Sequence, residues 1–134
     1  MAEFPSTEWI SKYRETVSVD QEMNVVGKFF DIDFLLGIGA KEYLMQVRKG
    51  KISEILENPT PLDTWSFAIR GPEESWKKFI QHVPPPLFND IFAGVFHGNF
   101  KLEGDIKVFM QNIRALFRML DVMREVEANH KGSQ

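Results

Sequence analysis

The sequence contains no cysteine, and this absence excludes disulfide bonds, thiolate metal sites and cysteine nucleophiles. The three histidines, His82, His97 and His130, are too far apart along the chain to form a metal-binding motif. A nucleophile elbow, a phosphate-binding loop and a dinucleotide fingerprint are also missing. We therefore expect a protein that is not an enzyme and that needs no metal or cofactor.

Long hydrophobic runs and an excess of positive charge are missing too. No apolar stretch approaches the ~18 residues that a membrane span requires, and the N-terminus "MAEFPSTEW" lacks the basic and apolar parts of a secretory signal. The net charge is −3, which provides no basic surface for nucleic acid. These absences predict a cytoplasmic protein with no nucleic-acid partner and no membrane span.

Aromatic residues, in contrast, are plentiful, with 12 Phe and 3 Trp in 134 residues. A chain of this length is expected to form one domain and to bury roughly two thirds of its unfolded surface. We divide it into an N-terminal helical extension (residues 1–22), a core (residues 23–126) and a flexible tail (residues 127–134). Apolar residues at helical spacing predict a helix at residues 7–17 within the extension.

Alternation of apolar and polar residues predicts four strands in the first half of the chain. The first covers residues 24–36, and its alternation places Asp31 and Asp33 on a solvated face rather than in a metal or acid/base pair. Two more, at residues 42–48 and 51–57, are joined by a tight turn. In the fourth, at residues 63–70, the alternation predicts one aromatic face, formed by Trp65, Phe67 and Ile69.

The second half of the sequence predicts helices with one further strand between them. Gly71-Pro72 begins a helix, and a second short apolar helix ends at Gly98. Residues 99–104 alternate as a fifth strand, and Asp105 is placed to cap a last, long helix. That helix has one continuous apolar stripe, formed by Ile106, Phe109, Ile113, Leu116, Phe117, Leu120 and Met123.

This order predicts an α+β fold, with a five-stranded, mostly antiparallel sheet that helices cover on one face. The segments "DTWSFAIRGPEESWKKFI" and "FAGVFHGNFKLEGDIKVFMQNIRALFRML" resemble the sterol carrier protein type 2 family in their aromatic strand, acidic helix start, short strand between glycines and long last helix. "YLMQVRKGKI" is similar to an earlier hairpin of that family. The resemblance covers roughly residues 23–122.

The resemblance implies an apolar tunnel between the sheet and the C-terminal helices, which holds a fatty acid, acyl-CoA, sterol or related lipid without altering it. Burial of an apolar ligand is favourable by roughly 25 cal/mol per Å², and aromatic rings suit the walls of such a site. The alternative is that the same residues fill a solid core. The residues expected to contact the ligand are Phe30, Ile32, Phe34, Trp65, Phe67, Ile69, Phe79, Phe88, Phe92, Phe96, Phe109, Ile113, Phe117 and Leu120.

Two polar residues are candidates for other contacts. The alternation turns Lys28 inward, where it would meet the head group of a ligand or extend past the edge of the strand. His97 lies at a helix end, as a capping or surface residue, and would be the first candidate for catalysis if it faced a pocket.

Three functions stay open on the sequence. The first is a noncatalytic carrier of a lipid or other hydrophobic small molecule. The second is a small-molecule enzyme, or an accessory subunit, that holds a hydrophobic substrate in the same cavity. The third is an interaction module with a solid core. Transient contact with a membrane and formation of a homodimer are further expectations about partners.

Overall fold

The computed structural model describes residues 4–81, 84 and 91–132, and it has the predicted α+β architecture. One five-stranded sheet has the order β3-β2-β1-β4-β5. β1 and β4 pair in parallel, whereas the other neighbours pair antiparallel, so the sheet is mixed and mostly antiparallel. The strands are β1 (Asp33–Ile38), β2 (Lys41–Arg48), β3 (Lys51–Glu57), β4 (Phe67–Gly71) and β5 (Lys101–Gly104).

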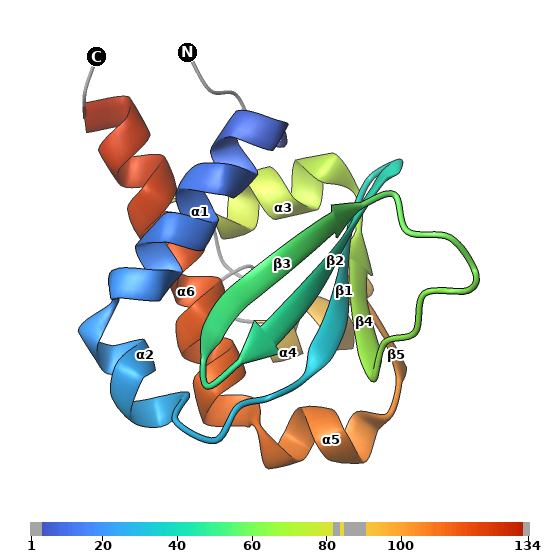
Figure 1. Cartoon of the computed structure of the whole chain (residues 1–134). Coiled ribbons are helices and arrows are strands. Elements are labelled where there is room, and N and C mark those ends of the chain that lie inside the picture. Colours follow the sequence, from blue (N-terminus) through green and yellow to red (C-terminus); the bar gives the residue numbers. More distant parts are fainter. Residues whose placement is uncertain (1–3, 82–83, 85–90, 133–134) are drawn as a thin grey trace.

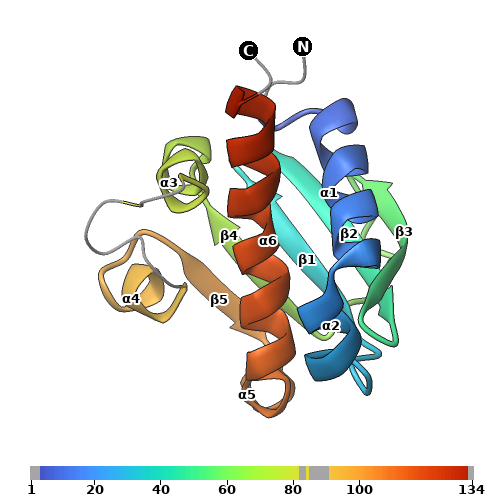
Figure 2. The same cartoon turned by 90° about the vertical axis from the view of Figure 1, so that its left-hand side faces the viewer.

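The described helices lie on one face of this sheet, as the sequence predicts (Figure 1). In Figure 2, α6 crosses in front of the sheet, with α1 and α2 on one side of it and α3 and α4 on the other. The helices are α1 (Thr7–Val19), α2 (Gln21–Val26), α3 (Glu73–Phe79), α4 (Ile91–Phe96), α5 (Ile106–Gln111) and α6 (Ile113–Gly132).

Three of the helices begin at a side chain that accepts a hydrogen bond from their first turn. Ser6 caps α1 by accepting from the backbone N–H of Trp9 at 3.1 Å. Asp20 caps α2, and Asp105 caps α5 as predicted. Each cap satisfies a backbone donor that the helix itself leaves unpaired. The helix predicted at residues 7–17 is confirmed as α1, which extends two residues further.

The strand predicted at residues 24–36 is wrong in its first half. The cap at Asp20 starts a short helix there, and the chain then turns at residues 27–29 before β1 begins at Asp33. Gly27 fits this turn because a Cβ on it would lie 2.9 Å from the Cα atom of Gly50 in the β2–β3 hairpin. Lys28 consequently lies on the turn and is exposed, so the expectation that it points inward is wrong.

The single long helix predicted after Asp105 is two helices, with a break at Asn112. The side-chain amide of Asn112 donates to the carbonyl oxygen of Val108 at 2.9 Å, and its backbone N–H donates to Phe109 at 3.2 Å. Asparagine competes with helix hydrogen bonding in this way, which explains the break. α6 then continues to Gly132, so residues 127–132, expected in a flexible tail, are helical.

Trp65 lies on the opposite face of the sheet from Phe67 and Ile69, so the single aromatic face predicted for residues 63–70 is wrong. β4 begins only at Phe67, and Trp65 precedes it in the loop. There it packs against Leu35 and Ala68 on the outer face, where no helix lies among the described residues. Alternation predicts the face of a side chain only where the backbone is an extended strand, and Trp65 precedes the strand.

Two glycines with positive φ bracket β5, as expected from the sequence. Gly98, after α4, has φ +80°, and Gly104, at the end of the strand, has φ +91°. Residues with a Cβ rarely adopt such values, so glycine allows the chain to reverse at both points. Phe100, between the two, is buried against the rings of Trp76 and Phe79. The short strand thereby joins the helical layer to the edge of the sheet.

Candidate functional site

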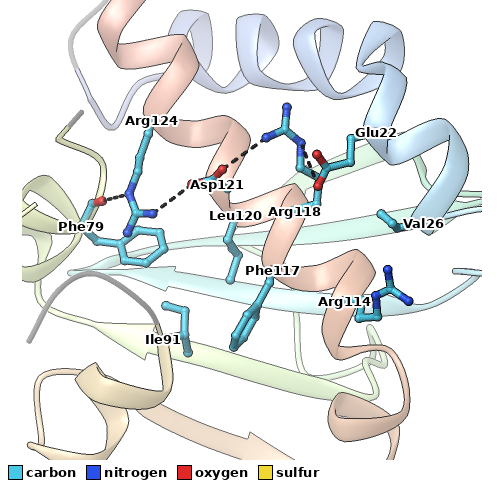
Figure 3. A pocket seen from close by; sticks show the side chains of 10 residues that line it. All are labelled: Glu22, Val26, Phe79, Ile91, Arg114, Phe117, Arg118, Leu120, Asp121 and Arg124. Atoms are coloured by element: carbon cyan, nitrogen blue, oxygen red, sulfur yellow. Dashed lines mark hydrogen bonds and ion pairs between the residues drawn. The ribbon is translucent and has the colours of Figure 1, made fainter. Parts of the chain in front are cut away.

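A pocket of about 430 Å³ runs beside α6 and is open to solvent (Figure 3). Its volume falls within the range typical of small-molecule sites, roughly 300–1,000 Å³. Helix α6 supplies most of the lining, while α2, α3 and α4 supply the rest. The lining residues are Glu22, Val26, Phe79, Ile91, Arg114, Phe117, Arg118, Leu120, Asp121 and Arg124.

The floor of the pocket is apolar and is formed by four helices. Phe79, Ile91 and Leu120 are buried side chains from α3, α4 and α6. Phe117, from α6, and Val26, from α2, are half-buried. In the view of Figure 3, the side chains of Ile91 and Phe117 both lie below that of Leu120. This floor offers an apolar molecule a surface on which burial is favourable.

Arg118 anchors one side of the pocket by tying α6 to α2. Its guanidinium lies 2.6 Å from the Asp20 carboxylate, 3.2 Å from Asp121 and 2.8 Å from Glu125. The hydrogen bond from Arg118 lowers the pKa of Asp20, and the same bond raises the pKa of Arg118. Asp20 therefore both caps α2 and holds that helix against α6.

Arg124 anchors the other side of the pocket by tying α6 to the end of α3. Its Nε donates to the carbonyl oxygen of Phe79 at 2.8 Å, and its guanidinium lies 2.9 Å from Asp121. The guanidinium also stacks over the Phe79 ring, 4.3 Å from the ring centroid. Arg118 and Arg124 are thus occupied by the protein itself and hold the walls in place.

Arg114 differs from the other two arginines of the pocket. It is exposed, and no ion pair or hydrogen bond to it is found in the part of the chain that the structure describes. Figure 3 places it at the end of the pocket away from Arg124. An apolar floor with an available guanidinium at one end suits a molecule with an apolar body and an anionic group.

Three of the predicted ligand-contacting residues line this pocket, namely Phe79, Phe117 and Leu120. Phe88 lies outside the described residues, as do the side chains of Phe92 and Phe96. For all of these residues, contact with a ligand stays a prediction.

Most of the other predicted contact residues fill the interior between the sheet and α5. The rings of Phe30, Phe34, Phe67 and Phe109 follow one another with centroids 6.3, 5.3 and 5.4 Å apart, and all four are buried. Ile69 is buried in the same core, and Ile32 and Ile113 pack against it. The open volume described here therefore lies along α6, while stacked rings occupy part of the space in which the tunnel is expected.

The polar candidates from the sequence lie elsewhere. Asp31 accepts a hydrogen bond from the backbone N–H of Lys49, and Asp33 pairs with Arg48 at 2.7 Å, so the two carboxylates have different partners. His97 is exposed in the turn after α4. In the described ranges, His, Asp and Glu side chains form no group of three that could bind a metal ion.

Sequence reasoning missed Ile91 and the polar residues of the pocket. Arg114, Arg118 and Asp121 recur at spacings of four and three, so they share one face of α6, and this periodicity was visible in the sequence. Val26 was assigned to the strand predicted at residues 24–36 and Glu22 to the end of the N-terminal extension, so the helix that carries both, α2, was not expected.

Comparison with solved structures identifies the fold. The chain superimposes on sterol carrier protein 2 with a TM-score of 0.74 and 13% sequence identity, over 92% of this chain and 98% of that one. A conserved hypothetical protein from Thermus thermophilus gives a TM-score of 0.72 at 14% identity, covering 92% and 90% of the two chains. A ubiquinone synthesis protein, UbiJ-SCP2, gives 0.56 at 8% identity, covering 84% and 90%. The chain thus has the sterol carrier protein 2 fold.

By sequence, no family model and no curated protein matches the chain. In the described part of the chain, no helix is both long enough and apolar enough to cross a membrane.

Proposed function

We propose that this protein binds a lipid or similar hydrophobic molecule in the pocket beside α6 and transfers it without chemical change. The observation that carries the proposal is an apolar floor, open to solvent, within a sterol carrier protein 2 fold. Burial of about 300 Å² of apolar ligand surface, at roughly 25 cal/mol per Å², contributes about 7 kcal/mol. A binding free energy of this size alone corresponds to a dissociation constant of about 10 µM. The free-energy cost of association weakens the binding, and the polar contacts of the ligand must offset that cost.

The available guanidinium of Arg114 favours an anionic amphiphile over a neutral one. A fatty acid presents a carboxylate, and an acyl-CoA presents phosphates, and both groups form charge-assisted hydrogen bonds with arginine. A sterol has only a hydroxyl to offer. We therefore place the chain of the ligand on Phe117, Leu120 and Ile91, and its anionic group at Arg114.

Tryptophan fluorescence provides a direct test, because the three tryptophans lie in different places. The Trp76 ring lies 5.7 Å from the ring of Phe79, which lines the pocket. Trp65 lies on the opposite face of the sheet, and Trp9 lies on α1. A fatty acid that carries a nitroxide quencher on its chain should therefore quench Trp76 in a saturable way.

Two variants identify the source of the signal. Trp65→Phe should retain the quenching, whereas Trp76→Phe should lose most of it while an unlabelled, radioactive fatty acid still binds. If fatty acids of several chain lengths, an acyl-CoA and a sterol all fail to bind the wild-type protein, the proposal is wrong.

A second function draws on the likeness to the ubiquinone synthesis protein. In this second function, the protein would be an accessory subunit that presents a hydrophobic substrate to a partner enzyme. Binding assays with the purified chain cannot separate this function from transport, but transfer assays can. A carrier moves a fluorescent lipid between two populations of vesicles unaided, whereas an accessory subunit binds the lipid and does not accelerate its transfer.

A further inference from the structure

Large apolar side chains are exposed at one end of the molecule. Val25 is 74% exposed and Phe29 is 85% exposed, on α2 and the turn after it, while Ile106 and Met110 on α5 are 44% and 50% exposed. Figure 1 places α2 and α5 on either side of the first turn of α6, and Figure 2 shows α5 below that turn with α2 beside it. Exposed apolar residues are ordinary when scattered, but their grouping at one end of a domain indicates an interaction surface.

The turn that carries Phe29 is fixed from both sides. The backbone N–H of Phe30 donates to Gly27 at 2.9 Å, and the N–H of Gly50 donates to Phe30 at 3.0 Å. The Phe30 ring is buried in the core, so the chain cannot turn Phe29 inward without removing Phe30. The exposure of Phe29 is therefore built into the fold, and the same contacts bring the β2–β3 hairpin beside it.

Basic side chains surround these apolar ones. We call residues 25–33, 48–51 and 105–114 together the α2/α5 end. Its basic residues are Lys28, Arg48, Lys49, Lys51, Lys107 and Arg114. Its acidic residues are half as many, namely Asp31, Asp33 and Asp105, while Glu22, in the first turn of α2 and outside these ranges, lies 3.9 Å from Arg118. The α2/α5 end is thus positively charged, although the whole chain has a net charge of −3, so the rest of the chain is acidic.

The acidic residues of the α2/α5 end are also engaged within the protein. Asp33 pairs with Arg48, Asp31 accepts from the backbone of Lys49, and Asp105 caps α5. The lysine side chains, by contrast, extend from exposed positions, and the ammonium of Lys28 lies 5.7 Å from the centroid of the Phe29 ring. Apolar and cationic groups on one surface complement a bilayer that has acyl chains below anionic head groups.

We propose that the α2/α5 end docks on the surface of an anionic lipid bilayer, with Phe29 inserted at the level of the acyl chains. The lysines of the β2–β3 hairpin and α5 would then contact the head groups. Val26 and Arg114 belong to this end and also line the pocket beside α6. Docking in this orientation brings the pocket to the membrane, where a lipid can enter it without crossing water.

Cosedimentation with vesicles tests the proposal. The wild-type protein should bind vesicles of phosphatidylcholine with about 30 mol % phosphatidylserine, and should bind pure phosphatidylcholine much more weakly. Raising the salt concentration should release it, because exposed charges are screened beyond a Debye length of about 10 Å at 0.1 M. The double variant Lys49→Gln/Lys51→Gln should weaken binding by about fivefold per lysine, and Phe29→Ser should weaken it by about tenfold.

Matched control variants remove the same kinds of side chain elsewhere. Leu62 is 91% exposed in the loop between β3 and β4, and Figure 1 shows this loop on the side of the sheet opposite α2, so Leu62→Ser should bind vesicles like the wild type. Lys12→Gln on α1 provides the matching control for charge. All of these positions are exposed, so the variants should melt at the wild-type temperature, which a circular dichroism melt verifies.

A fluorescent variant tests the insertion of Phe29. Trp9 and Trp76 are buried, so Phe29→Trp adds an exposed tryptophan whose emission should shift to the blue with anionic vesicles. Failure to bind these vesicles, equal weakening by the control variants, or the absence of a blue shift would overturn the proposal. So would light scattering that shows a dimer lost in Phe29→Ser, because a second copy of the chain would then cover this surface.

This inference can fail independently of the proposed function. Binding of a fatty acid in vesicle-free buffer reports on the pocket alone, and Phe29→Ser should leave it unchanged. A protein that binds fatty acid but no vesicles would refute the docking surface only. One that binds vesicles but no lipid monomer would refute the proposed function only.

Discussion

Replacement of Phe117 and of Phe109 by alanine should separate the wall of the pocket from the solid core. Both residues belong to the apolar stripe predicted from the sequence. Phe109 is fully buried and meets the Phe67 ring edge-on, with centroids 5.4 Å apart. Phe117 is half-buried, and one of its sides faces the open volume beside α6. The same chemical change is therefore made in two different environments.

The expected cost follows from how many protein neighbours each ring loses. Truncation of a close-packed phenylalanine destabilises a protein by about 3–5 kcal/mol, because it leaves a cavity with no partner atoms. We expect Phe109→Ala to fall in this range. Phe117→Ala should cost about 2 kcal/mol, since solvent already meets part of the ring. For a domain with about 5–15 kcal/mol of total stability, these two values are readily distinguished.

Urea unfolding followed by circular dichroism measures both losses, and a fatty-acid titration of each folded variant measures the effect on binding. With a slope of about 2 kcal/mol per M, the midpoint should fall by about 1 M for Phe117→Ala and by about 2 M for Phe109→Ala. Phe117→Ala should also alter affinity or chain-length preference, while Phe109→Ala should not. Equal losses of stability with unaltered binding in both variants would refute the assignment of Phe117 to the wall of a ligand site.

Three further outcomes are expected from single substitutions. Asp20→Asn should lower the free energy of unfolding by about 2 kcal/mol, because it removes the ion pair with Arg118, while the asparagine oxygen can still cap α2 by accepting from Met23. Because the pKa of Asp20 is lowered in the native state, its charge stabilises the fold at any pH above the usual carboxyl pKa of about 3.9. This contribution disappears as the pH falls through the native pKa. Urea melts should therefore show that Asp20→Asn loses less stability in acid than the wild type does. Gly98→Val should cost about 2 kcal/mol in a urea melt because of the positive φ alone, since no heavy atom lies within 4 Å of the new Cβ, and Gly98→Asn should cost less. Arg114→Gln should weaken fatty-acid binding about tenfold and leave the binding of a neutral sterol unchanged in the same titration.

The sheet could be predicted from the sequence because its strands have one face that packs on the helices. In β2 the residues Tyr43, Met45 and Val47 alternate, Lys49-Gly50 marks the turn that follows, and the hairpin forms as predicted. β5 is also recognisable, since Gly98 and Gly104 mark both of its ends. In each case a local signal and the burial pattern indicate the same structure, which is what makes a segment predictable.

The segment before β1 was mispredicted because two signals there conflict. Phe30 and Phe34 both face the core, at a spacing that suits a strand, yet Asp20 starts a helix that ends only at Val26. A side chain can be buried from a turn as well as from a strand, so burial alone does not fix the backbone. The close approach of Gly27 to Gly50 decides the conformation, and this contact between distant parts of the chain is not visible in the local pattern.

The candidate site was predictable only in part, for a related reason. Phenylalanines that fill a core and phenylalanines that line a pocket have the same periodicity, so Phe67 and Phe117 could not be told apart from the sequence. What distinguishes them is whether neighbouring helices close over the ring. That depends on contacts such as those of Arg118 with Asp20 and of Arg124 with Phe79, which join residues 98 and 45 positions apart.

These polar contacts also indicate which parts of the pocket can adapt to a ligand. Hydrogen bonds and ion pairs are directional, so Arg118 holds α2 and Arg124 holds the end of α3 at defined positions on α6. The contacts of Ile91 and Phe117 on the floor are apolar, and apolar contacts have no preferred direction. A bulkier ligand should therefore shift these two side chains before it shifts the walls, whose directional contacts fix their geometry. Selectivity should accordingly depend on the charged group near Arg114 more than on the shape of the apolar chain.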